Sequence, residues 1–178
     1  MTYLALLRGV NVGGKNKVEM KQLKTVFEEA GMTSVKTYIN SGNVIFSTTL
    51  RGRPRLVRLL EGAIAQRFGF RIDVLLRDVK SMKAVVKALP THWTNDKTMK
   101  CDVMFLRDDV DRPSILKQLP FKPELEDVRY APGAVIWRVD RKNVTRSGMM
   151  RLVGTPLYKR MTIRNSNTTR KLLELMEV

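Results

Sequence analysis

The sequence predicts an α+β protein built from two similar units. Over residues 1–89, short apolar runs rich in β-branched residues alternate with amphipathic stretches in the order β-α-β-β-α-β. A second series of strands and helices follows in residues 90–178 and ends in further helical segments. A chain of 178 residues can form two small domains with separate cores. Since this order is that of the split βαβ unit, we predict two ferredoxin-like subdomains, 1–89 and 90–178, with additional C-terminal helices.

Local signals delimit the elements of the first unit. The apolar run Tyr3–Leu7 is typical of a buried strand, Gly31 ends a helical pattern, and Pro54 begins another. Residues 40–43 tolerate a positive φ and therefore predict the turn of a hairpin. The predicted elements are a strand at 3–7, a helix at 20–30, strands at 35–39 and 44–47, a helix at 54–68 and a strand at 70–76.

The second unit follows a helix that Asp78 caps and a connector at 90–100. Its predicted elements are a strand at 102–106, a short helix at 113–119, strands at 128–130 and 134–139, and helical segments at 149–158 and 168–176. Leu7-Arg8 matches Leu106-Arg107 at the end of each unit's first strand. Residues 38–46 resemble 130–137, with one residue fewer in the turn, and the two similarities together indicate an internal duplication.

The charge of the chain favours an anionic partner. Its 33 basic residues outnumber its 17 acidic ones, for a formal net charge of +16. Arginines cluster at 51–58, and residues 138–171 hold ten basic residues against the single acidic Asp140. Such blocks attract polyanions, so nucleic acid or a phosphorylated small molecule is the expected partner. The alternative is that these residues form ordinary solvated faces.

Cysteine and histidine usage excludes several kinds of site. The single Cys101 rules out an internal disulfide, which favours a cytoplasmic location. With His92 as the single histidine, a Cys–His zinc site is excluded, and we expect neither a metal nor a cofactor. No apolar run is long enough to span a membrane, and the N-terminus lacks the pattern of a signal peptide, so no membrane partner is expected.

The most distinctive motif is the loop at residues 9–17. Residues 9–15 fit the phosphate-loop spacing G-x-x-x-x-G-K, but Asn16 replaces the Ser or Thr that would bind Mg²⁺. The predicted antiparallel topology also argues against nucleotide hydrolysis. Binding of an anion stays open, because backbone N–H groups of consecutive glycines and a helix N-terminus both attract negative charge.

The predicted topology brings this loop close to turn 40–43. In a split βαβ unit the first two strands run in the same direction, so the segments that follow them share one edge of the sheet. The candidate ligand-binding residues at this edge are Arg8, Asn11, Gly13, Gly14, Lys15, Asn40, Ser41 and Asn43. In the alternative interpretation the glycines only shape a tight turn, Asn16 caps the helix and Glu19 completes a capping box.

A second candidate segment precedes the last predicted helix. Arg164, Asn165 and Asn167 would favour a phosphate at a helix N-terminus. Capping of that helix by Asn165 or Asn167 is the more ordinary role for these residue types. The acidic residues of segment 108–111 could coordinate Mg²⁺, but Asp before a helix is more often a cap.

Aromatic side chains on the two predicted hairpins have two interpretations. Tyr38, Phe46, Tyr130 and Trp137 could stack on the bases of an RNA, or they could belong to the core.

The loop, the first hairpin and the C-terminal segment resemble a known family. Residues 6–14 and 37–44, together with 93–96, 102–106 and 162–168, resemble the bacterial family called domain of unknown function 1697 (DUF1697). The resemblance implies two ferredoxin-like α+β subdomains and no established activity. This chain departs from the family at Ser166, where a tryptophan is usual.

Three functions therefore remain as hypotheses. The leading one is a non-catalytic binder of nucleic acid or another phosphate-bearing ligand at loop 9–17 and turn 40–43. The second is a small enzyme that acts on a phosphorylated metabolite and uses Arg8, Lys15 and Arg164 to stabilise charge. The third is a protein-interaction module. The sequence assigns no catalytic residue and no oligomeric state.

Overall fold

The computed structural model describes residues 1–178 and has an α+β fold with two four-stranded antiparallel sheets. Its contacts divide the chain into two compact units, Met1–Val79 with Glu174–Val178, and Lys80–Leu173. No helix combines the length and the apolar character that crossing a bilayer requires.

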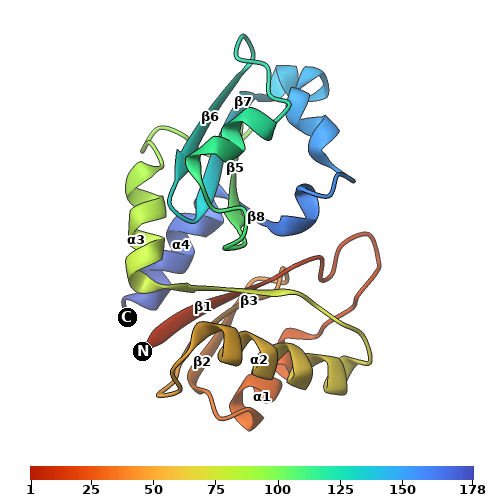
Figure 1. The fold of residues 1–178 in the computed structure, drawn as a ribbon, viewed down its shortest axis with the longest axis vertical. Helices are drawn as coiled ribbons and strands as arrows, with labels where there is room; N and C mark the ends of the chain where they lie inside the picture. Colours follow the sequence, from red (N-terminus) through yellow and green to blue (C-terminus); the bar gives the residue numbers. More distant parts are fainter. The chain divides into compact units, whose positions relative to one another are not determined.

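The first unit is a sheet with two helices on one face (Figure 1). Its elements are β1 (Thr2–Leu7), α1 (Met20–Glu29), β2 (Thr33–Tyr38), β3 (Asn43–Ser47), α2 (Arg53–Phe68) and β4 (Val74–Asp78). The strands lie in the order β2-β3-β1-β4, with β1 antiparallel to both of its neighbours. The predicted elements are present, although β4 begins at Val74 rather than near Phe70.

The core of this unit lies between the sheet and the two helices. The helices bury Phe27 of α1 and Leu60 of α2 against Leu7 and Phe46 of the sheet. The rings of Phe27 and Phe46 meet edge to face, with centroids 5.4 Å apart. Burial of these large side chains explains why an amphipathic pattern was readable in both helices.

The second unit has less helix between its strands. Its helices are α3 (Val79–Ala88, whose first residue belongs to the first unit) and α4 (Ser166–Met176, whose residues from Glu174 on belong to the first unit). Its strands are β5 (Met99–Leu106), β6 (Glu126–Ala131), β7 (Ala134–Asp140) and β8 (Met161–Asn165). The 3₁₀ turns are η1 (Pro113–Gln118), η2 (Arg141–Arg146), η3 (Gly148–Leu152) and η4 (Tyr158–Arg160). The strands lie in the order β6-β7-β5-β8.

One prediction for this unit was wrong, and one strand was missed. The segment predicted as a helix at 149–158 consists mostly of short 3₁₀ turns and loops. Strand β8 was not predicted, because five residues with alternating apolar and polar character carry a weak signal.

The aromatic residues Phe46 and Trp137 belong to the cores. Phe46 is fully buried and Trp137 is 3% exposed. Base stacking by these two side chains is therefore wrong, because neither presents a ring face to solvent.

Matching hydrogen bonds occur at the first strand of each unit. The Leu7 amide donates to the Gly42 carbonyl at 2.8 Å, and the Leu106 amide donates to the Gly133 carbonyl at 2.9 Å. The next residue along, Arg8 or Arg107, donates its amide to the segment before the last strand, at Asp73 or Arg160, each at 3.0 Å. The two units therefore share the local geometry at the similarity Leu7-Arg8 and Leu106-Arg107.

The hairpins differ by two residues in the turn, not by one. Tyr38 pairs with Asn43 across the first turn, whereas Ala131 pairs with Ala134 across the second. The Pro132-Gly133 turn thus has two residues, and the first turn has four.

Candidate functional site

Loop 9–17 forms a small hairpin that follows β1. The Lys15 amide donates to the Val12 carbonyl at 3.1 Å, and the Asn11 amide donates to the Asn16 carbonyl at 3.1 Å. Gly13 and Gly14 lie between these pairs with φ of 58° and 75°. Positive φ at both central residues is the requirement of a type I′ turn, which glycine meets without strain. The two glycines therefore form the tip of a hairpin.

This geometry differs from a phosphate loop. In that motif the lysine lies at the start of a helix, whereas here α1 begins at Met20, well after Lys15. The predicted capping box was wrong. The N-cap residue is Glu19, which makes no side-chain cap, and the Asn16 side chain instead donates to the Gly9 carbonyl at 3.2 Å. The hairpin thus presents its own backbone and side chains rather than a helix terminus.

Asn11 anchors the base of the hairpin. Its Oδ1 accepts the Val18 amide at 2.8 Å, and its Nδ2 donates to the carbonyls of Val18 at 2.9 Å and Asn40 at 2.8 Å. It also lies 3.2 Å from Oδ1 of Asn40. The structure therefore joins Asn11 to Asn40 as the topology predicted. Because its amide is engaged by the protein, Asn11 acts here as a positioning residue.

Turn 40–43 is held closely against β1. A Cβ on Gly42 would lie 2.6 Å from Cγ2 of Val10 and 2.7 Å from Cβ of Leu7, so only glycine fits. Asn43 is fully buried, and its Nδ2 donates to the Tyr38 carbonyl at 3.0 Å and to Oγ of Ser41 at 2.9 Å. Asn43 and Ser41 thus shape the turn.

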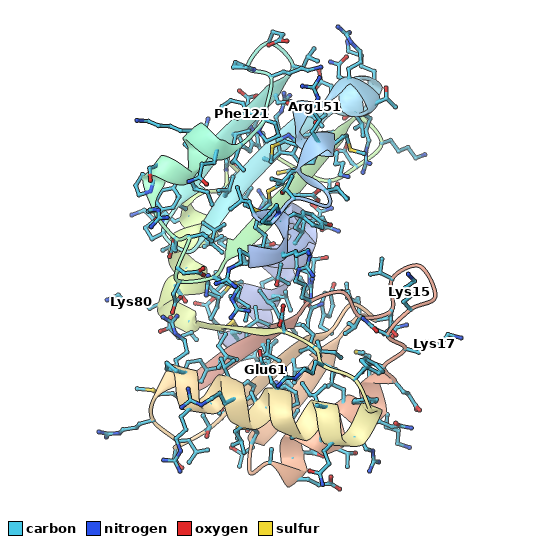
Figure 2. The ribbon with its side chains drawn as sticks, turned by 45° about the vertical axis from the view of Figure 1, so that its right-hand side comes forward. Lys15, Lys17, Glu61, Lys80, Phe121 and Arg151 are labelled. Carbon is cyan, nitrogen blue, oxygen red and sulfur yellow. The ribbon has the colours of Figure 1, made fainter.

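The cations at this edge differ in exposure. Arg8 is half-buried, whereas Lys15 and Lys17 are exposed and make no ion pair. Both lysines lie on the loop that connects β1 to α1 (Figure 2). No acidic residue occurs between Arg8 and Val18. The hairpin is thus a positively charged loop with two exposed lysines.

The second candidate segment lies in the second unit. Arg164 belongs to β8 and is 9% exposed, with Nη1 donating to the Ile163 carbonyl at 2.8 Å. Burial lowers the pKa of Arg164 to about 10. Asn165 caps α4, because its Oδ1 accepts the Thr168 amide at 2.8 Å. The capping interpretation is thereby confirmed for Asn165.

Asn167 and Arg170 hold the connector that precedes β5. Nδ2 of Asn167 donates to the Asn95 carbonyl at 2.9 Å, and its Oδ1 accepts the Asn95 amide at 3.2 Å. The Arg170 guanidinium donates to the carbonyls of Trp93 at 3.0 Å and Pro90 at 2.7 Å. These side chains are therefore engaged within their own unit.

Position 166 is a packing position. Ser166 is fully buried and hydrogen-bonds the Cys101 thiol. A small hydroxyl thus occupies this site beside β5.

The acidic segment 108–111 pairs within the protein. Asp109 forms an ion pair with Arg160, and Asp111 accepts hydrogen bonds from the Tyr130 hydroxyl and the Gly133 amide, each at 2.9 Å. The expected cap is absent, since the N-cap residue of η1 is Arg112 and makes no side-chain cap. No group of three His, Cys, Asp or Glu side chains is placed to hold a metal ion.

One buried polar cluster had no sequence signal. Glu126 is 3% exposed and accepts hydrogen bonds from the amides of Lys122 and Gly148, at 2.6 and 3.0 Å. It also accepts from the Trp137 indole at 2.9 Å and from the Ser147 hydroxyl. A lone glutamate in a short strand does not reveal such a set of donors, because they come from three separate segments.

Comparisons with known proteins identify a family and a similar solved structure. The family described as "Protein of unknown function (DUF1697)" matches residues 1–137, which excludes the motif at 162–168. Among solved structures, the conserved bacterial protein SP0830 from Streptococcus pneumoniae is 28% identical, with a TM-score of 0.83 over 98% of each chain. A search of curated proteins finds no match. Because the family match covers most of its residues, this chain belongs to the DUF1697 family.

Proposed function

We propose that this protein is a non-catalytic binder of an anionic, phosphate-bearing ligand at the edge formed by loop 9–17 and turn 40–43. The observation that carries the proposal is the pair of exposed lysines, Lys15 and Lys17, on a hairpin that holds no acidic residue. The formal net charge of +16 supports it, because the field of the whole chain draws anions toward every exposed cation.

Rigidity of the hairpin also supports a binding role. The hydrogen bonds of Asn11 hold both the base of the loop and the carbonyl of Asn40. A site fixed before binding loses less conformational entropy when the ligand arrives. Arg8 at the base, the glycine tip and the two lysines thus form a preorganised set of cations and donors. Arg164, Asn165 and Asn167 form a separate set in the second unit, whose side chains mainly serve its structure.

Nucleic acid is the phosphate source that we favour. Residues 12–17 of the hairpin are exposed, and an exposed cationic loop suits an extended polyanion better than a small molecule, which binds in concave sites. The titration of fluorescent single-stranded RNA, single-stranded DNA and duplex DNA, each of about 20 nucleotides, tests this between 50 and 200 mM salt. We expect affinity to fall log-linearly with salt, and the double substitution Lys15→Ala with Lys17→Ala to reduce the slope by about 2.

The control is Lys36→Ala, which removes an exposed lysine of β2 outside the hairpin. If the control weakens binding as much as Lys15→Ala or Lys17→Ala made singly, binding is not localised at the loop. Thermal protection by inorganic phosphate or a mononucleotide, without binding of any oligonucleotide, would assign the edge to a small phosphorylated molecule instead. A flat salt response with all three nucleic acids and no protection by phosphate would contradict the proposal.

We also propose that residues 1–89 and 90–178 are two ferredoxin-like domains. The element order β1-α1-β2-β3-α2-β4 and the strand order β2-β3-β1-β4 support this for the first. The equivalent strand order β6-β7-β5-β8 supports it for the second, with 3₁₀ turns in place of crossover helices. A cytoplasmic location is proposed as well, supported by a single, buried cysteine.

A further inference from the structure

A groove of about 640 Å³ runs between α1 and α2 in the first unit. Val26 of α1, Ala30 just after α1, and Leu59 and Ala63 of α2 give it an apolar lining. A second hollow of about 410 Å³ adjoins it on α2 and also includes Gly62. The two hollows share Arg58 and Gly62 in their linings, so Gly62 lies where they meet on α2.

Neither packing nor backbone conformation within the protein requires a glycine at position 62. It lies inside α2, where glycine is among the least favourable residues for helix formation. A Cβ at this position would meet no atom within 4 Å, and its φ is not in the left-handed region. Close packing and backbone conformation thus both fail to explain it. The missing side chain leaves the helix backbone open to a partner that approaches from outside.

Charge identifies the kind of partner that fits. Arg58 and Arg67 line the groove, are exposed, and make no ion pair. They are nine residues apart on α2, or roughly 13 Å along a helix axis. Between them lies Leu59, which is 41% exposed although it is a large apolar side chain. An apolar floor flanked by two guanidiniums complements a segment with apolar residues on one face and carboxylates beside them.

We propose that this groove docks an acidic amphipathic helix of a partner protein. The apolar face of that helix packs on Leu59, Ala63 and Val26, and its backbone crosses α2 at Gly62. Its carboxylates pair with Arg58 and Arg67, while Glu29 on α1 favours a basic residue at the opposite rim. This docking site is independent of the phosphate-binding role proposed for loop 9–17, and it involves none of that loop's residues.

The test uses a synthetic fluorescent helix of about 15 residues, which matches the 16 residues of α2 in length. It carries leucines at heptad spacing and glutamates at the flanking positions. A scrambled peptide of the same composition is the matched control, because it keeps the charge but loses the apolar face. We expect the amphipathic peptide to bind at least about tenfold more tightly than the scrambled one. Amide chemical-shift changes should concentrate in α1 and α2.

Two substitutions at one position examine the crossing point. Gly62→Leu fills the depression and should weaken peptide binding by at least about tenfold. Gly62→Ala adds only a Cβ into open space and should bind nearly as the wild type does. Thermal unfolding and circular dichroism of both variants verify that the fold is kept.

A charge swap examines the two guanidiniums. Arg58→Glu combined with Arg67→Glu should abolish binding of the acidic peptide and create binding of a matched peptide with lysines in place of glutamates. Four results would overturn the proposal: no binding of the amphipathic peptide, equal binding of the scrambled one, no gain for the lysine peptide, or chemical-shift changes confined to loop 9–17. An RNA oligonucleotide that binds α1 and α2 and depends on Arg58 would assign the groove to nucleic acid and overturn it as well.

Discussion

The indole N–H of Trp137 donates a hydrogen bond of 2.9 Å to the carboxylate of Glu126 inside the second unit. Ser147, Lys122 and Gly148 donate to the same carboxylate, so Glu126 is the common acceptor of four hydrogen bonds. Removal of a buried, hydrogen-bonded charge is costly, because it leaves the donors without a strong partner. This carboxylate ties β6, β7 and the start of η3 together.

Glu126→Gln is therefore expected to lower the free energy of unfolding by about 2 to 3 kcal/mol. The amide keeps the size of the side chain but turns an NH₂ group toward donors. Urea denaturation followed by Trp fluorescence measures the loss. Asp127→Asn, at an exposed neighbouring position whose ion pair with Arg138 is partly exposed, should change stability by less than about 1 kcal/mol. Equal losses in the two variants would contradict this role.

Acid should destabilise the wild type through the same residue. Burial raises the pKa of Glu126, but the hydrogen bonds from Ser147, Lys122, Trp137 and Gly148 outweigh it and hold the pKa below its ordinary value. A carboxylate with a lowered folded-state pKa stabilises the protein above the ordinary glutamate value of about 4.3, and the contribution is lost as the pH falls through the folded value. Unfolding free energies measured from pH 7 to pH 3 should fall less steeply in Glu126→Gln than in the wild type.

Gly148→Ala is expected to destabilise the protein severely. A Cβ at this position would lie 1.8 Å from the Pro120 carbonyl oxygen, which is backbone and cannot rotate away. We expect a loss of about 3 kcal/mol or more, or failure to fold. Gly62→Ala is the matched control, since it should stabilise α2 by up to about 1 kcal/mol. Melting temperatures of both variants give the comparison, and a Gly148→Ala variant as stable as the wild type would refute the close contact.

Asn11→Ala should loosen the hairpin without unfolding the unit. The substitution removes the side-chain bonds to Val18 and Asn40 and places alanine at a φ of 55°. Faster hydrogen exchange of the Val18 amide, with slow exchange kept in β1 and β3, is the expected signature. Asn11→Gly removes the same bonds but suits the positive φ, so it should be more stable than Asn11→Ala. The order of the two variants separates hydrogen bonding from backbone strain.

The thiol of Cys101 should be unreactive in the folded protein. Burial raises its pKa to about 11, despite the opposing hydrogen bond from Ser166, so the thiolate form is scarce at neutral pH. We expect a thiol reagent at pH 8 to label Cys101 only at the rate of unfolding, and rapidly in denaturant. Labelling of the native protein at the rate of a free thiol would show that the side chain is accessible.

Elements with strong periodicity were predictable from the sequence, and contacts between distant segments were not. The helices from Met20 and near Pro54 have apolar faces at regular spacing, so their positions are confirmed. Strand β8 was missed because its five residues form a strand through pairing with β5, which is distant in the sequence. The loop at 9–17 was recognised as a feature, but its shape depends on left-handed backbone at Asn11 and Asn16, which residue spacing does not reveal. The proximity of Asn11 and Asn40 was predictable, because the order of strands alone brings their loops to one edge.

The role of Gly62 in α2 could not be predicted from the sequence alone. A glycine inside an amphipathic helix is visible in the sequence, but its meaning depends on whether a neighbour fills the space above it. Gly42 and Gly62 look equivalent as letters, yet a Cβ on Gly42 would collide with Val10 while one on Gly62 would meet nothing.

The hydrogen bonds at the end of the first strand of each unit are shared by the two halves, whereas other features of the halves differ. Leu7 with Gly42 and Leu106 with Gly133 hold a hairpin turn in the same place, although one turn has four residues and the other two. Between these fixed points the first half uses two α-helices, and the second uses 3₁₀ turns. The two halves thus share the pairing of their strands, whereas the segments that connect the strands differ. An engineer could therefore exchange a crossover while the sheet stays intact.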